Sequence, residues 1–125
     1  MYQPPKDIPE SMRHYFCMWN EIDPTLIRGH LDLAISEDCI WVDPQNSHVG
    51  RIGLENNVKA FRAKYPTAEL DISSNVDGHN NRFRYNWIIS EQGKTLMRGF
   101  DVATLNDDGL VERVDGFFGE LVPTK

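Results

Sequence analysis

One acidic residue, Asp101, stands within a largely apolar run, LMRGFDVATL, whose composition is typical of a β-strand. Side chains of a strand alternate between its two faces, and both rows of this strand are largely apolar. We therefore expect Asp101 to be shielded from water, which raises the pKa of a carboxylic acid and lets the neutral acid donate a hydrogen bond. The alternative is a structural role, in which Asp101 pairs with a buried group such as Arg98 of a neighbouring subunit, or caps a bulge.

Asp43 and Tyr15 also carry groups that can take part in proton transfer. Asp43 ends a predicted strand and precedes Pro44. An Asp-Pro pair commonly begins a turn, but a carboxylate at a strand end can also lie at a pocket mouth and act as a general base. Tyr15 lies on the apolar face of a predicted helix, where a phenol usually bonds to a backbone group. The same phenol could instead donate to a developing oxyanion.

Composition and charge exclude several classes of function. Of the 125 residues, 40% are hydrophobic and 26% are charged, which is the balance of a globular domain. The net charge is −6 and no run of Lys or Arg occurs, so we expect no nucleic-acid partner. The longest apolar runs are far shorter than a membrane span, so we expect no membrane partner either.

The sequence also predicts a cytoplasmic location and chemistry without a metal or cofactor. The first ten residues, MYQPPKDIPE, lack the apolar core of a signal peptide. Cys17 and Cys39 lie far apart and form no CxxC pair, which favours a reducing compartment. The four histidines share no metal-ligand spacing, and no phosphate loop or dinucleotide fingerprint is present.

The helices that must position these residues lie in the first half of the chain. We expect a flexible proline-rich arm over residues 1–9 and a single domain over residues 10–125. Three helices are predicted from apolar residues at helical spacing. These residues are Met12, Tyr15, Phe16 and Trp19 in the first helix, Ile27, Leu31, Ala34 and Ile35 in the second, and Leu54, Val58, Phe61 and Tyr65 in the third.

Strands dominate the second half. A strand is expected at CIWV (39–42), between the second and third helices, and four antiparallel strands are expected after Pro66. In RFRYNWII, the apolar positions from Phe83 to Ile89 alternate with polar ones. Helices on one face of an antiparallel sheet define an α+β domain, and long strands covering three helices must curve.

Three stretches of the chain resemble the NTF2-like superfamily, particularly its SnoaL-like branch. They are SEDCIWVDP, GRIGLENNVKAFRAKYP and RGFDVATLNDDGLVERVDGFFGE. The resemblance extends over nearly all of the chain from about residue 10. It implies a cone fold, in which a curved antiparallel sheet wraps around three helices and leaves a pocket for a hydrophobic small molecule. The fold hosts many unrelated activities, so it does not by itself imply one reaction.

Ketosteroid isomerases of this superfamily resemble the chain at three positions. Their helix-one tyrosine, five residues before an asparagine, matches Tyr15 and Asn20, and their strand-end base matches Asp43 before a proline. Their oxyanion-hole acid matches Asp101 on a late strand. The resemblance implies that Asp43 takes a proton next to a carbonyl, that Tyr15 and a neutral Asp101 stabilise the enolate, and that no cofactor is needed.

The function expected from the resemblance is that of an acid/base isomerase or cyclase with an aromatic pocket. The expected pocket residues are Trp19, Trp41, Phe61, Trp87, Met97, Asp115 and Phe118. One alternative is a non-catalytic ligand-binding or structural dimeric domain. A lesser alternative is epoxide hydrolysis by Arg98, Asp101 and Asp115, although residues three apart on a regular strand face opposite sides.

The outer face of the expected sheet predicts a homodimer. Arg82, Arg84, Asn86 and Ile88 alternate with the inward row of their strand. On the next strand, Leu96, Phe100 and Val102 are exposed if the helices cover only the other face. Exposed apolar rows on a sheet indicate a partner, and the family resemblance makes that partner a second copy of the chain.

Overall fold

The computed structural model describes residues 2–125, which form three α-helices, one short 3₁₀ helix and seven strands. The helices are α1 (Glu10–Trp19), η1 (Pro24–Leu26), α2 (Ile27–Ala34) and α3 (Arg51–Lys64). The strands are β1 (Ile35–Val42), β2 (Ser47–Val49), β3 (Ala68–Ile72), β4 (Asp77–His79), β5 (Arg82–Glu91), β6 (Lys94–Leu105) and β7 (Val111–Phe118).

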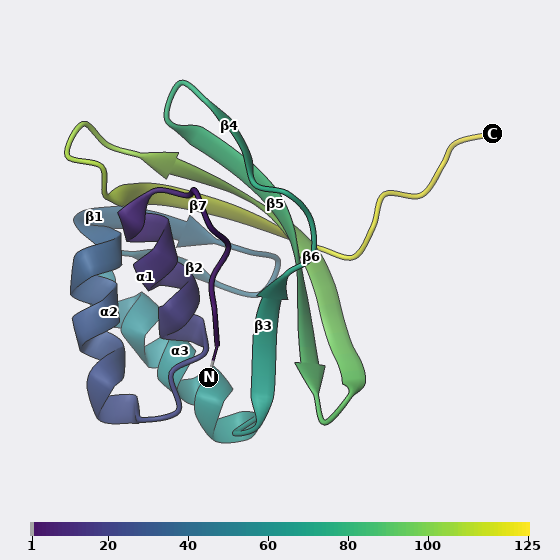
Figure 1. The fold of residues 1–125 in the computed structure, drawn as a ribbon, viewed down its shortest axis with the longest axis horizontal. Coiled ribbons are helices and arrows are strands. Elements are labelled where there is room, and N and C mark those ends of the chain that lie inside the picture. Colours follow the sequence, from purple (N-terminus) through teal and green to yellow (C-terminus); the bar gives the residue numbers. More distant parts are fainter. Residues whose placement is uncertain (1) are drawn as a thin grey trace.

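The strands form one sheet in the order β2-β1-β7-β6-β5-β3, with β4 paired to β5. All neighbouring strands are antiparallel except β1 and β7, which are parallel. Figure 1 shows the sheet curving around α1, α2 and α3, which lie together on its concave face. The predicted α+β cone is therefore confirmed, with one parallel pair in a sheet that was expected to be antiparallel throughout.

The helices bury the residues that their spacing predicted. In α1, the side chains of Met12, Tyr15, Phe16 and Trp19 are all buried. Phe16 contacts Tyr85 of β5 edge to face, with 5.1 Å between the ring centroids, so α1 packs directly on the sheet. Ile27 and Leu31 of α2 and Leu54 and Val58 of α3 complete the fully buried layer between the helices and the sheet.

Three details of the secondary structure differ from the prediction. Ile35, expected in the second helix, begins β1, because it pairs with Val111 of β7 and is fully buried there. The turn-rich loop after Asp43 contains β2, which pairs with β1. The first three residues of the predicted turn DGHNN form β4. Both additional strands are only three residues long, so they leave no alternating pattern in the sequence.

The N-terminal segment lies against the domain over the part that the structure describes. Tyr2 and Ile8 pack on the core, and Arg13 donates a hydrogen bond of 3.3 Å to the carbonyl of Pro5. Figure 1 shows this segment running back beside α1. These contacts lie within the arm predicted over residues 1–9, of which Met1 is outside the described residues.

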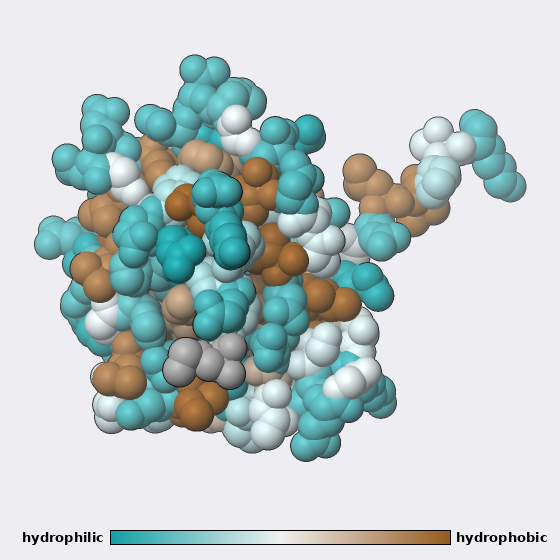
Figure 2. All heavy atoms as spheres, in the orientation of Figure 1, coloured by the Kyte–Doolittle hydropathy of each residue, from teal (hydrophilic) through white to brown (hydrophobic). Residues whose placement is uncertain are grey.

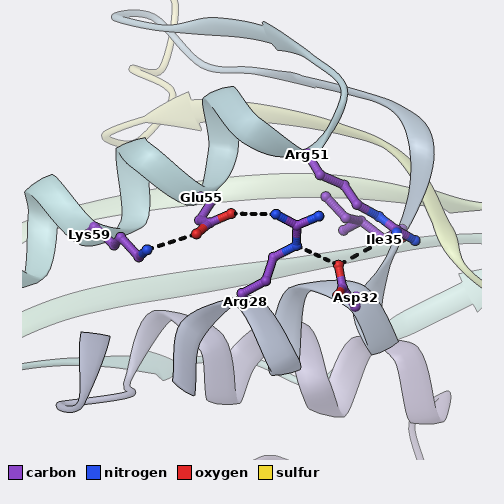
Figure 3. Close-up of polar contacts among 6 residues, drawn as sticks. All are labelled: Arg28, Asp32, Ile35, Arg51, Glu55 and Lys59. Carbon is purple, nitrogen blue, oxygen red and sulfur yellow. Dashed lines mark hydrogen bonds and ion pairs between the residues drawn. The ribbon is translucent and has the colours of Figure 1, made fainter. Parts of the chain in front are cut away.

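An ion-pair network joins α2 to α3 and to the start of β1 (Figure 3). Its members are Arg28, Asp32, Ile35, Arg51, Glu55 and Lys59. Arg28 donates to Asp32 at 2.8 Å and to Glu55 at 3.0 Å, and Glu55 also accepts from Lys59 at 2.7 Å. The network holds α2 and α3 together on the side of the helical layer that faces water.

The chain leaves the domain after β7. Residues 119–125 extend away from the body of the molecule, as Figures 1 and 2 show, and Leu121 is fully exposed. Among residues 2–125, no helix combines the length and the apolar character that crossing a membrane requires.

Candidate functional site

A cavity of about 380 Å³ lies between the inner face of the sheet and helices α1 and α3. Its wall is largely aromatic, and most of the predicted pocket residues contribute to it. These are Trp19, Trp41, Phe61, Trp87, Met97 and Phe118. All three predicted catalytic residues, Tyr15, Asp43 and Asp101, also line this cavity. The fold therefore brings two carboxyl groups and one phenol into a single, mainly apolar space.

Asp115 is the predicted pocket residue that the structure places elsewhere. Gly116 is the residue of β7 opposite Asp101, so Asp115 shares the other face of the sheet with Val102. There its carboxylate accepts a hydrogen bond of 2.9 Å from Arg113. Asp115 is therefore a residue of the outer face rather than of the cavity.

Asp101 is buried in β6, with both carboxyl oxygens hydrogen-bonded. Its Oδ1 accepts a bond of 2.9 Å from the indole nitrogen of Trp87, and its Oδ2 accepts one of 3.0 Å from the hydroxyl of Tyr85. The side chain is 9% exposed. Both donors come from the inward row of β5, where Tyr85 lies directly opposite Asp101.

The pKa of Asp101 is raised, as the shielding expected from the sequence predicts. Burial raises the pKa of Asp101, the hydrogen bonds from Trp87 and Tyr85 lower it, and the charges of Asp43 and Asp115 raise it, so that it comes to about 6. The direction of this shift is the one that shielding predicted, and the neutral form of Asp101 stays a prediction. The two hydrogen bonds that oppose the shift could not be foreseen from the sequence, because they depend on strand register.

Gly116 leaves the space into which Asp101 points. A Cβ atom built at Gly116 would lie 2.9 Å from Oδ1 of Asp101 and 3.4 Å from Cβ of Asp43. The two carboxyl groups therefore approach the cavity from either side of this glycine. Any side chain at position 116 would separate them or displace Asp101.

Tyr15 presents a polarised hydroxyl to the cavity. Its oxygen accepts a hydrogen bond of 2.8 Å from the indole nitrogen of Trp41. Within residues 2–125 it donates to no other group, so its hydrogen is available to a ligand. Burial and the charge of Asp101 raise the pKa of Tyr15 well above its ordinary value. The phenol is therefore a neutral hydrogen-bond donor.

Asp43 lies at the end of β1, where its Oδ1 organises the following turn. This oxygen accepts bonds of 2.8 Å from the backbone nitrogens of both Gln45 and Asn46. Over the described part of the chain, Oδ2 accepts no hydrogen bond. Asp43 therefore both forms the turn, through Oδ1, and lines the cavity.

Asn20, which the family resemblance matched together with Tyr15, lies at the end of α1, outside the cavity lining. It fixes this end of the helix. Its side chain accepts from the nitrogen of Leu70 at 2.8 Å and donates to the carbonyl of the same residue at 2.9 Å. These paired bonds tie α1 to β3. Because Leu70 itself lines the cavity, Asn20 helps to shape the cavity wall.

The three residues considered for epoxide hydrolysis are separated by the sheet. Asp101 faces the cavity, whereas Arg98 is exposed and Asp115 lies on the outer face with Val102. The β6 strand is regular between positions 98 and 101, so residues three apart point to opposite sides. This geometry does not assemble the set of groups that the epoxide mechanism needs.

A polar edge of the cavity was missed in the sequence. It is formed by Gln45, Asn46, Asn57 and Lys64. Asn57 and Lys64 lie four residues before and three after Phe61 in α3, on the same face of the helix. The helical spacing around Phe61 could therefore have revealed both of them. The positions of Gln45 and Asn46 at the cavity depend on the path of the turn after Asp43. Helical or strand spacing does not determine that path.

Comparison with solved structures gives several whole-domain matches. A candidate isomerase of the SnoaL-like family from Agrobacterium tumefaciens is 30% identical, with a TM-score of 0.82 over 88% of this chain and 95% of that one. A candidate polyketide cyclase from Sinorhizobium meliloti is 14% identical, with a TM-score of 0.70 over 88% and 95% of the two chains. An NTF2-like protein of unknown function from an Exiguobacterium species is 13% identical, with a TM-score of 0.72 over 89% and 99%.

Two other comparisons give no match. No protein-family model matches the sequence, and no curated protein matches it significantly. The second and third structures above are too distant in sequence to support more than the fold.

Proposed function

The chain belongs to the SnoaL-like family of NTF2-like proteins, and from this premise we propose that it catalyses proton transfer next to a carbonyl group. The substrate is a small, mainly hydrophobic molecule held in the cavity between the sheet and α1 and α3. The reaction is an isomerisation or a cyclisation, and its acid/base steps require no cofactor.

The observation that supports this proposal most directly is that a buried carboxyl group and a phenol with an available hydrogen share one cavity. Asp101 and Tyr15 both line it, the first as an acceptor of two hydrogen bonds and the second with a hydrogen that no group among residues 2–125 accepts. In the proposed step, the Asp101 carboxylate takes a proton from the carbon beside the carbonyl. The C–H electron pair moves to form the enolate, whose oxygen accepts the hydrogen bond of Tyr15.

The enolate then has two possible fates. The proton held by Asp101 can return to a different carbon, which moves a double bond. Alternatively, the enolate carbon can attack a second carbonyl, which closes a ring, and the alkoxide formed there takes the proton held by Asp101. Asp43 is the second carboxylate of the proposed mechanism. Because its Oδ2 is free of hydrogen bonds, it can take or return a proton on its own side of Gly116.

The wall of the cavity supports the substrate class. Trp19 contacts two other rings of the wall, with 5.9 Å between its centroid and that of Trp41 and 5.6 Å to that of Phe61. Trp87 and Phe118 meet edge to face, at 6.0 Å. Such rings favour a planar apolar ligand, while the carboxylates and the phenol orient its polar end.

The test is deuterium exchange and double-bond migration in a small cyclic β,γ-unsaturated ketone, followed by NMR in D₂O. We expect Asp101→Asn to lower the catalysed rate about 100-fold or more. Asp77→Asn, which changes an exposed acid paired with Arg84, should leave the rate unchanged. If Asp101→Asn exchanges as fast as Asp77→Asn, the assignment is wrong. Binding of the ketone without exchange would instead favour the non-catalytic alternative.

We also propose that the chain forms a homodimer through the outer face of the sheet. Phe117 is 58% exposed there, and the neighbouring Phe100 and Val102 are only half-buried. An apolar row of this kind favours burial against a second copy. Sedimentation should therefore give the mass of a dimer, and Phe117→Asp should shift it to a monomer. A monomeric wild-type protein would contradict the proposal.

A cytoplasmic location remains part of the proposal. Cys17 and Cys39 are both free thiols, which supports a reducing compartment. Expression of the tagged protein and fractionation of the cells tests this location directly.

A further inference from the structure

Tyr85 and Trp87 donate the two hydrogen bonds that Asp101 accepts, a contact separate from the part that Trp87 plays in the cavity wall. We propose that Tyr85 and Trp87 are positioning residues that keep Asp101 ionised, and that they thereby set the pH at which the pocket accepts a proton. This inference rests on the proposed function, because it matters for a reaction only if Asp101 is the base. The bonding itself can be tested without any substrate.

The geometry of these donors favours the carboxylate form. Trp87 can only donate, so its bond to Oδ1 requires a lone pair on that oxygen. Tyr85 donates to Oδ2, and a proton on Oδ2 would compete with that bond. Each oxygen thus has its own donor, and protonation weakens the acceptor for at least one of them. The carboxylate satisfies both donors at once.

The backbone is built to bring these donors to Asp101. Tyr85 pairs directly with Asp101, and Trp87 pairs with Gly99, two residues earlier on β6. A Cβ atom at Gly99 would overlap the Trp87 indole, so only glycine allows the ring to lie across β6 and reach Oδ1. Gly116 leaves room for the same oxygen on the β7 side. Three strands therefore contribute to one arrangement, which we call the donor clamp (Tyr85, Trp87, Gly99 and Gly116).

Other groups act against the donor clamp. Burial favours the neutral acid, and so do the negative charges of Asp43, beyond β1, and Asp115, on β7. Tyr15 faces Asp101 from α1, and its own pKa is raised by the charge of that carboxylate. With the donors in place, the pKa of Asp101 is about 6, below physiological pH. Without one of them, the balance moves toward the neutral acid.

The experiment is a carbon-detected NMR titration of the Asp101 carboxyl group in the wild type and in single variants. We expect Tyr85→Phe and Trp87→Phe each to raise the pKa of Asp101 by about 1 to 2, since a hydrogen bond to a charged group is lost. Tyr2→Phe is the matched control, because its hydroxyl is buried but makes no hydrogen bond within residues 2–125. The control should titrate at the wild-type pH.

The outcomes separate this inference from the proposed function. If the pKa of Asp101 in both variants equals that in the Tyr2→Phe control, the donor clamp does not keep Asp101 ionised. This conclusion holds even where ketone exchange is observed. If the pKa rises as expected while the wild type exchanges no proton, the donor clamp is supported and the proposed function fails. If the protein is active, the acid limb of the pH–rate profile should shift to higher pH in both variants, by the same amount as the pKa of Asp101. A variant that is merely less stable would lower the rate without moving that limb.

Discussion

The indole nitrogen of Trp41 donates a hydrogen bond of 2.8 Å to the hydroxyl of Tyr15, which joins the end of β1 to the middle of α1 inside the cavity. The two residues are 26 positions apart in the chain and both are buried. The same bond that ties the helix to the sheet also orients the phenol. A low-dielectric site strengthens such a chain of donors, because each bond polarises the next.

Replacing Tyr15 should therefore affect both stability and rate. Tyr15→Phe leaves the buried Trp41 N–H without an acceptor, which we expect to lower the free energy of unfolding by about 1 to 3 kcal/mol. Loss of the oxyanion donor should lower the rate of ketone exchange about 100-fold. Urea denaturation and NMR exchange measure the two effects. Tyr2→Phe, which removes a buried hydroxyl that makes no hydrogen bond to the described residues, should keep or raise stability.

The stability of the protein should depend on pH through Asp101. Its pKa is about 6 in the folded state against 3.8 ordinarily, so the folded state holds the proton more tightly. Proton binding to Asp101 therefore stabilises the folded state by about 3 kcal/mol below pH 4. This stabilisation is lost as the pH rises through 6. Urea denaturation of wild type and Asp101→Asn between pH 4 and 7 measures the difference. Parallel curves for the two proteins would contradict the assignment.

The rate of the reaction should show the opposite dependence. A protonated Asp101 cannot accept a proton, so we expect the rate to fall as the pH drops through about 6. A rate that instead rises toward acid pH would mean that the neutral acid is the active form. The pH–rate profile with a ketone substrate thus distinguishes a base from a hydrogen-bond donor at this position.

Gly116 should tolerate no side chain. The added methyl of Gly116→Ala would lie 2.9 Å from Oδ1 of Asp101, so this oxygen must move. We expect a loss of about 1 to 3 kcal/mol in stability, together with a lower rate of exchange. Gly29→Ala is the control, because its methyl meets nothing within 4 Å in α2. That change should stabilise the protein by about 0.5 to 1 kcal/mol, and thermal unfolding measures both variants.

The network between α2 and α3 should contribute modestly and depend on salt. Glu55→Gln removes two ion pairs, to Arg28 and Lys59 (Figure 3), and we expect a loss of about 1 kcal/mol that shrinks in high salt. Glu37→Gln changes an exposed acid with no ion pair among the described residues, so it should have no effect. Equal losses for the two variants at low salt would show that the network contributes nothing specific.

Much of the cavity wall follows from sequence periodicity. Helical spacing placed Tyr15, Trp19 and Phe61 on faces that the structure buries or partly buries, because an amphipathic helix can cover a sheet in only one orientation. Strand alternation likewise placed Trp87 in the inward row of β5. These predictions needed only the period of each element, without knowledge of its neighbours.

The orientation of Asp101 could not be predicted in this way, because it depends on a β-bulge. Near the turn, Ser90 pairs with Thr95, but Ile89 pairs with Met97, so Leu96 is an extra residue in β6. Without this extra residue, the pairing seen at the turn would continue unchanged along both strands. Asp101 would then lie opposite Arg84, on the outer face. The bulge turns Asp101 inward and brings it to Tyr85. No residue type in the hairpin signals its presence.

The parallel pairing of β1 with β7 has a consequence for how the protein is made. Strand β7 follows the six other strands in the chain but lies between β1 and β6, so a nascent chain carries two unpaired strand edges until β7 has been made. Asp43 is translated before β7, which carries its neighbour Gly116. Such distant pairings make folding slow, and the open edges can meanwhile pair with other chains. A truncation before β7 should therefore yield an aggregation-prone polypeptide rather than a smaller folded domain.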